Sequence, residues 1–196
     1  MTKIKNKIKK ESGFTLIEVV IALAISLLIV LMISSSYFVA QHAYVKADSK
    51  AEISQNGRVI IDRLARELRQ TPDIITALPA DNSNPSLTPN AIIFQDGHDT
   101  SRIAYVRYYL SGTNLNRQLL AYHFPAEPAV YVYWNATDSR YPGVSPQMSV
   151  LEDKLIGEYV SDIEFWGNEK PVYINLNLHK NKDSVILNTS VYGRNL

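Results

Sequence analysis

Apolar residues dominate one long stretch near the amino terminus. From Phe14 to Val45, Glu18 and His42 are the only side chains that titrate below pH 9, and residues 19–33 are apolar except for Ser26. About 20 mainly apolar residues are enough for a helix to cross the core of a bilayer. Residues 14–40 are therefore predicted to form a membrane-spanning helix.

The pattern becomes amphipathic after residue 40. Apolar residues and one glycine recur at spacings of three and four, at positions 53, 57, 60, 61, 64 and 68, and charged residues fill the other faces. This spacing predicts that residues 41–71 continue the helix with one buried face. No proline precedes Pro72, and Gly57 is the only glycine between Phe14 and Gln70. A single helix of roughly 55 residues, ending at Thr71-Pro72, is the prediction.

The rest of the chain has the signals of strands. Residues 78–90 contain three prolines and several turn-forming residues, so they are predicted to be an exposed connector. Runs rich in β-branched and aromatic residues then predict strands at 91–95, 102–110, 115–124, 129–134, 160–166, 172–179 and 184–192. Residues 145–160 are ambiguous between a loop with a short helix and a strand. Strict apolar and polar alternation over 172–179 indicates a strand with one buried face.

These elements predict an α+β fold, in which a long amino-terminal helix packs its amphipathic half on an antiparallel sheet. The expected organisation is a leader at 1–13, a membrane and assembly half of the helix at 14–40, its amphipathic half at 41–71, a connector at 72–90, and a β-rich domain at 91–196. One globular domain is what 196 residues allow beside a membrane segment.

Charge and cysteine content narrow the function. Residues 1–13 hold five of the 20 basic residues and one of the 19 acidic residues, so the remaining chain has a formal charge of −3. Lysines before the apolar segment predict that the chain beyond it lies outside the cytoplasm. The chain has no cysteine, which excludes disulfides, thiolate metal sites and a cysteine nucleophile.

Glu18 lies five residues into the predicted membrane span. A lone carboxylate there costs roughly 2.5–3.5 kcal/mol on insertion scales, so an acid at this position indicates function. Snorkelling of the side chain to the interface is the alternative. An ordinary secretory signal predicts small residues after the apolar run, but Ala22 and Ala24 lie inside it, and the small residue that precedes the run is Gly13.

The lysine-rich leader, Gly13 and the following Phe14-Thr15-Leu16-Ile17-Glu18-Val19 closely resemble the class III signal of type IV pilins and of the pseudopilins of type II secretion and competence systems. The resemblance implies that a prepilin peptidase cuts between Gly13 and Phe14 and methylates the new amino terminus at Phe14. It also implies that Glu18 pairs with the Phe14 amine of a neighbouring subunit, or with its own before assembly. The uncut chain lacks this amine, so it cannot offset the cost of Glu18 by this pairing.

The same resemblance implies the partners and the location. The partners are other pilins or pseudopilins, the prepilin peptidase, an inner-membrane assembly platform and membrane lipid. The protein would span the cytoplasmic membrane once before assembly, and then belong to an extracellular pilus or a periplasmic pseudopilus. More loosely, residues 108–119, 155–166 and 189–196 look like those of PilW-type minor pilins and J-type minor pseudopilins, which are initiating or tip-proximal subunits.

No catalytic motif is present, so the protein is expected not to be an enzyme and to need no cofactor or metal. Residues 95–101 hold two acids and a histidine but are predicted to be a turn rather than a cation site. Aromatic residues gather between positions 105 and 141, which sheet packing or a subunit contact would explain. The charge of the mature chain argues against nucleic acid as a partner, although the arginines at 58, 63, 66 and 69 leave a local patch open.

Two rival functions share the membrane span. One is an uncleaved single-pass membrane protein whose outer β domain binds a ligand. The other is a pilus subunit with an additional role in adhesion or DNA uptake. Amino-terminal processing separates the first of these from a filament subunit.

Overall fold

The computed structural model describes residues 13–99, 102–140, 142–167 and 171–193. The chain divides into two compact units, with the boundary between Lys46 and Ala47. Among the described residues, the first unit is helical, and the second contains the end of the same helix and seven strands.

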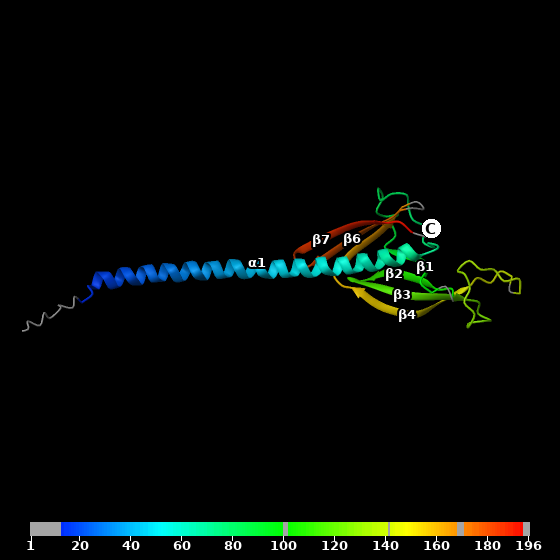
Figure 1. Cartoon of the computed structure of the whole chain (residues 1–196), viewed down its shortest axis with the longest axis horizontal. Coiled ribbons are helices and arrows are strands. Elements are labelled where there is room, and N and C mark those ends of the chain that lie inside the picture. The colour runs from blue at the N-terminus through cyan, green and yellow to red at the C-terminus, as the bar shows by residue number, and fades with distance from the viewer. Residues whose placement is uncertain (1–12, 100–101, 141, 168–170, 194–196) are drawn as a thin grey trace, which may run out of the picture. The chain divides into compact units, whose positions relative to one another are not determined.

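Helix α1 runs from Leu16 to Gln70 and has 55 residues, which confirms the single long helix predicted from the pattern (Figure 1). It ends where expected, because Pro72 disfavours helical backbone at the preceding Thr71. Thr71 is fully buried, and its hydroxyl oxygen lies 2.8 Å from the Asp73 carbonyl oxygen and 2.7 Å from the Gln95 carbonyl oxygen, which share its one proton. These bonds fix the direction in which the chain leaves the helix.

The strands form two antiparallel sheets. The first has the order β1-β2-β3-β4, with β1 at Ala91–Gln95, β2 at Tyr105–Ser111, β3 at Asn114–His123 and β4 at Gln147–Gly157. The second has the order β5-β6-β7, with β5 at Val160–Trp166, β6 at Val172–Lys180 and β7 at Asp183–Val191. The α+β prediction is therefore confirmed.

The core of the second unit lies between the last part of α1 and the sheets. The helix contributes the apolar face predicted from its spacing, since Ile53, Ile60, Leu64 and Leu68 are buried in one cluster with strand residues. Gly57 permits close packing: a Cβ there would lie 2.5 Å from Leu187 Cδ1, so the Leu187 side chain would have to shift. The absence of a side chain lets this part of the helix approach β6 and β7.

Residues 129–134 were predicted to form a strand, and this prediction is wrong. Only an isolated bridge between Val132 and Tyr122 forms there, within the loop that joins β3 to β4. Pro125 and Pro128 lack backbone donors and interrupt the approach to this segment. The backbone N–H of Trp134 donates to the hydroxyl of the buried Tyr105 at 3.1 Å, whereas the side chains of Tyr133 and Trp134 are exposed.

Residues 147–157, which the sequence left ambiguous, form the longest strand, β4. Its residues do not alternate between buried and exposed positions, and two register shifts interrupt its pairing with β3. An edge strand with bulges loses the two-residue period by which strands are recognised.

The connector is exposed over most of residues 78–90, as predicted, and the backbone that flanks its exposed part bonds to both sheets. Residues 80–87 are exposed. The Ile75 N–H donates to Ile93 O at 2.9 Å, and the Gly167 N–H donates to Pro79 O at 2.8 Å. The connector thus supplies backbone bonds to β1 of one sheet and to the residue after β5 of the other, and part of it belongs to the core.

Candidate functional site

The amino-terminal end of α1 holds Glu18 by a reciprocal set of hydrogen bonds with Thr15. The Thr15 N–H and hydroxyl donate to Glu18 Oε2 at 2.8 Å and 2.9 Å, and the Glu18 N–H lies 3.4 Å from the Thr15 hydroxyl oxygen. This is a capping box, in which the residue before the helix and the third helical residue satisfy each other's backbone donors. The carboxylate also lies at the positive end of the helix dipole.

Hydrogen bonds from Thr15 therefore offset part of the cost of Glu18 even in the uncut chain, which lacks the Phe14 amine. The Glu18 carboxylate accepts two hydrogen bonds from Thr15 while residues 1–13 are still attached. A satisfied polar group costs less in an apolar environment than an unsatisfied one. The sequence contained this signal, since Thr15 and Glu18 have the spacing of a capping box ahead of an apolar run.

Gly13 and Phe14 lie outside the helix, in an exposed segment without regular structure. Phe14 is 88% exposed, and a Cβ at Gly13 would meet nothing within 4 Å. No contact among the described residues requires glycine at this position. The Gly13–Phe14 bond is accessible, and residues 1–12 of the predicted leader lie outside the described residues.

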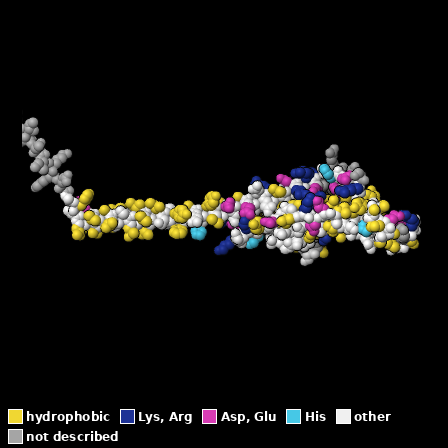
Figure 2. All heavy atoms as spheres, turned by 90° about the horizontal axis from the view of Figure 1, so that it is seen from below, with side chains coloured by type: hydrophobic (Ala, Val, Ile, Leu, Met, Phe, Trp, Pro, Cys, Tyr) yellow, Lys and Arg dark blue, Asp and Glu magenta, His cyan; other side chains and the backbone are white. Residues whose placement is uncertain are grey.

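The first part of α1 presents apolar side chains on all sides. The large hydrophobic residues between positions 16 and 45 are all exposed, and those on the face seen in Figure 2 form a continuous apolar surface. The hydroxyls of Ser26 and Ser36 donate to the carbonyls of Ala22 at 2.7 Å and Met32 at 2.9 Å. By length and composition α1 can cross a membrane, and the hydroxyls of Ser26 and Ser36 are satisfied within the helix.

Comparison with known families assigns this segment. Residues 8–34 match the family model described as the prokaryotic N-terminal methylation motif. The chain carries the class III signal of type IV pilins and pseudopilins. The match includes Gly13, Phe14 and Glu18, and a signal of this type implies association with other pilins and with a prepilin peptidase in general. A search of curated proteins returned no match.

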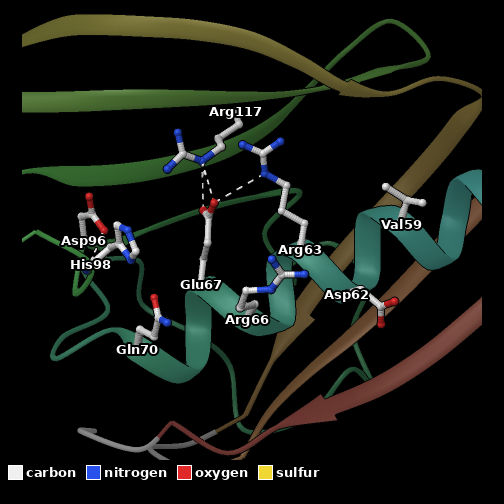
Figure 3. Close-up of a pocket in the computed structure, with 9 residues that line it drawn as sticks. All are labelled: Val59, Asp62, Arg63, Arg66, Glu67, Gln70, Asp96, His98 and Arg117. Carbon is white, nitrogen blue, oxygen red and sulfur yellow. Dashed lines mark hydrogen bonds and ion pairs between the residues drawn. The ribbon is translucent and has the colours of Figure 1, made fainter.

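A second polar feature lies in the unit that begins at Ala47, in a cavity of about 550 Å³ between α1 and the first sheet (Figure 3). Glu67 points from the helix towards Arg117 of β3, whose Nε lies 3.0 Å from both carboxylate oxygens. Arg63 lies 3.5 Å from Glu67, and the Tyr108 hydroxyl donates to Glu67 at 3.0 Å. Glu67 thus joins three side chains from the helix and two strands.

Burial determines the charge states in this network. Burial, reinforced by the nearby Glu67 carboxylate, raises the pKa of Tyr108 well above its usual range, so the phenol stays a neutral donor. Burial alone would lower the pKa of Arg117, but its hydrogen bonds with Glu67 raise it. Arg117 is therefore a permanent cation whose main partner is Glu67, and the network fixes the helix to the sheet.

The remaining candidates from the sequence are the arginine patch on the helix and the predicted turn at residues 95–101. Among the arginines of the suspected patch, Arg63 is paired with Glu67, as expected for a helix face with local ion pairs. Asp96 and His98 of the predicted turn line the cavity, and positions 100 and 101 lie outside the described residues. Within the described part of the chain, no group of three or more histidine, aspartate or glutamate side chains is arranged to hold a metal ion.

Proposed function

We propose that the chain is a minor pilin-like structural subunit without enzymatic activity. It is cleaved after Gly13, N-methylated at Phe14, and assembled through its helix into a type IV pilus or a type II secretion or competence pseudopilus. Its place is at initiation or at the tip of the filament. The observation that carries this proposal is the position of Glu18, a carboxylate anchored in the first turn of a helix with an uncovered apolar surface.

The local geometry supports processing at this point. Cleavage would create an α-amino group at Phe14, which is mostly cationic at neutral pH. Phe14 directly precedes Thr15, whose N–H and hydroxyl already bind the Glu18 carboxylate. The new cation would form next to the carboxylate, and the pair can then exist within one subunit or between neighbours.

The helix supports assembly within a membrane. Its apolar side chains are exposed, so burial against lipid or against other pilin helices is needed to cover them. We assign the partners as other pilins or pseudopilins, the prepilin peptidase, the inner-membrane assembly platform and lipid. The chain beyond the span lies outside the cytoplasm, in keeping with the lysines that precede it.

The test is the amino terminus of the protein purified from cells that contain their own prepilin peptidase. Mass spectrometry is expected to find a methylated Phe14 as the first residue. Retention of residues 1–13 would refute the proposal and favour an uncleaved single-pass protein. In that case the cavity beside Glu67 is the first place to look for a ligand.

Replacement of Glu18 tests its role in assembly separately from processing. The Glu18→Ala variant is expected to insert in the membrane normally and to be cleaved, but to be depleted from filaments. The matched control is Ser26→Ala, which removes a hydroxyl that bonds only within the helix. Equal incorporation of the Glu18 variant and the control would exclude the proposed pairing.

A further inference from the structure

Two of the four edge strands of the sheets, β4 and β7, differ in how they meet solvent. β4 carries Glu152, Asp153 and Lys154 near its centre, and two register shifts interrupt its ladder. Charges and bulges of this kind prevent an edge strand from pairing with another chain. β7 has neither: its nine-residue ladder with β6 has no register shift, and Asp183 at its start is its only charged residue.

The hairpin between β6 and β7 determines which backbone groups of β7 are unpaired. Two residues close the turn between Lys180 and Asp183, so these two flanking residues form a hydrogen-bonded pair, and such pairs recur at every second position. The N–H and C=O groups of the intervening residues point away from β6, at positions 184, 186, 188 and 190. Within the part of the chain that the structure describes, no strand pairs with this side of β7 (Figure 1).

The same four residues are the exposed ones of the strand. Ser184, Ile186, Asn188 and Ser190 are exposed, whereas their neighbours in β7 are half-buried or buried. They carry no charge, and Ile186 in the middle is 64% exposed. An incoming strand would meet a regular row of backbone donors and acceptors beside an uncharged side-chain surface, which is the arrangement used in β-strand addition.

We propose that the free edge of β7 binds an extended, uncharged segment of another subunit of the same filament, which adds a strand to the β5-β6-β7 sheet. This inference rests on the proposed function, because it takes the partner from the filament. The backbone of β7 supplies the hydrogen bonds, and the uncharged row selects against charged segments, whose desolvation would not be compensated.

The direction of β7 argues against a second copy in the favoured antiparallel pairing. Lys180, just before β7, pairs with Glu52, and Leu187 of β7 contacts the helix at Gly57. β7 therefore runs in the same direction as residues 47–70 of α1. Two β7 strands paired antiparallel would set these helix segments in opposite directions, although both chains enter them from the same membrane. A different segment of another chain has no such restriction.

The test uses full-length protein in its own cells, with a photo-crosslinking amino acid in place of Ile186. The matched control carries it in place of Leu151, an exposed residue of the charged β4 edge. Crosslinks from position 186, mapped by mass spectrometry to an extended segment of another filament subunit, are expected, with few from position 151. Equal yields from the two positions, crosslinks to a second copy, or no crosslink from position 186 would each overturn the proposal.

Proline substitutions separate the free edge from the internal ladder. Asn188→Pro removes an N–H that points away from β6 and leaves the bonds to β6 intact, so its melting temperature should be close to that of Asn188→Ala. The crosslink yield from position 186 should nevertheless fall by roughly fivefold, as expected for the loss of one hydrogen bond. Thr189→Pro should instead lower the melting temperature, because its N–H bonds to β6. Unchanged crosslinking in Asn188→Pro would overturn the inference.

The same samples distinguish this inference from the proposed function. Cleavage after Gly13 and co-purification with other pilins are scored by mass spectrometry before crosslinking. Uncleaved protein would refute the proposed function. Cleaved protein that co-purifies with pilins but gives no crosslink from position 186 would refute only the role of the β7 edge.

Discussion

Neutralising Glu67 should weaken the attachment of α1 to the first sheet. The side chains of Arg117 and Glu67 are 12% and 21% exposed, and the next carboxylate, on Glu152, lies 3.6 Å from Arg117. Removal of one partner from a fully buried pair costs about 3–5 kcal/mol, and an exposed pair contributes about 0–1 kcal/mol. For this partly exposed pair we expect Glu67→Gln to lower the free energy of unfolding by about 2–3 kcal/mol.

Thermal unfolding of the full chain in detergent can measure this loss through the fluorescence of its two tryptophans, which both lie after Ala47. A loss of that size corresponds to a drop in melting temperature of about 4–10 °C for a domain of this length. Arg58→Met is the control, because it removes an exposed arginine from the same helix. It should change the melting temperature by less than about 2 °C.

A double-mutant cycle then tests whether Glu67 and Arg117 act through each other. The variant with both Glu67→Gln and Arg117→Met should lose less stability than the two single losses combined, by about 1.5–3 kcal/mol. Additive losses would show that the ion pair does not contribute as a pair. A Glu67→Gln variant that melts like Arg58→Met would refute the reasoning about burial altogether.

Three further predictions concern other parts of the molecule. Gly97→Ala should lower the melting temperature by about 4 °C or more, because the new Cβ would lie 1.8 Å from the backbone oxygen of Gln70, which cannot move easily; a fully stable variant would contradict this packing. Lys180 lowers the pKa of Glu52 through a hydrogen bond, so the stabilisation by this pair should be complete above the ordinary pKa of a glutamate. It should be lost as the pH falls below the lowered pKa. A difference in melting temperature between the wild type and Lys180→Met that persists at acidic pH would contradict this expectation. Thr15→Val should speed amide hydrogen exchange in the first turn of α1 by roughly fivefold, because it removes a helix cap that contributes about 1 kcal/mol. Exchange in the last turn of α1 is the internal control and should not change.

The elements that the sequence predicted well have a regular period and residues that mark their ends. The strands at 91–95 and 160–166 begin and end where predicted, and α1 ends at the residue before Thr71-Pro72. Prediction from sequence failed where pairing with another strand decides whether a segment forms a strand or a loop. Residues 129–134 have the composition of a strand but pair with β3 only at the bridge between Val132 and Tyr122, and β4 pairs along its length although its pattern is irregular.

The amino-terminal site was predictable from sequence because its chemistry is local. Gly13, Phe14 and Glu18 lie within six residues, and the capping box with Thr15 needs only the first turn of a helix. The network around Glu67 was not predictable, since Tyr108 and Arg117 lie 41 and 50 residues away along the chain. Only Arg63, one helical turn before Glu67, was within reach of a local rule.

The sequence by itself therefore determined the membrane helix, its amphipathic continuation, the signal at its start and the α+β class, because each depends on composition and spacing over neighbouring residues. The tertiary structure alone decided which arginine Glu67 binds, how the connector joins the two sheets, and which edge strand is left open. Those outcomes depend on contacts between residues far apart in the chain, and β7 is distinguished from β4 only once the strand order and register are known.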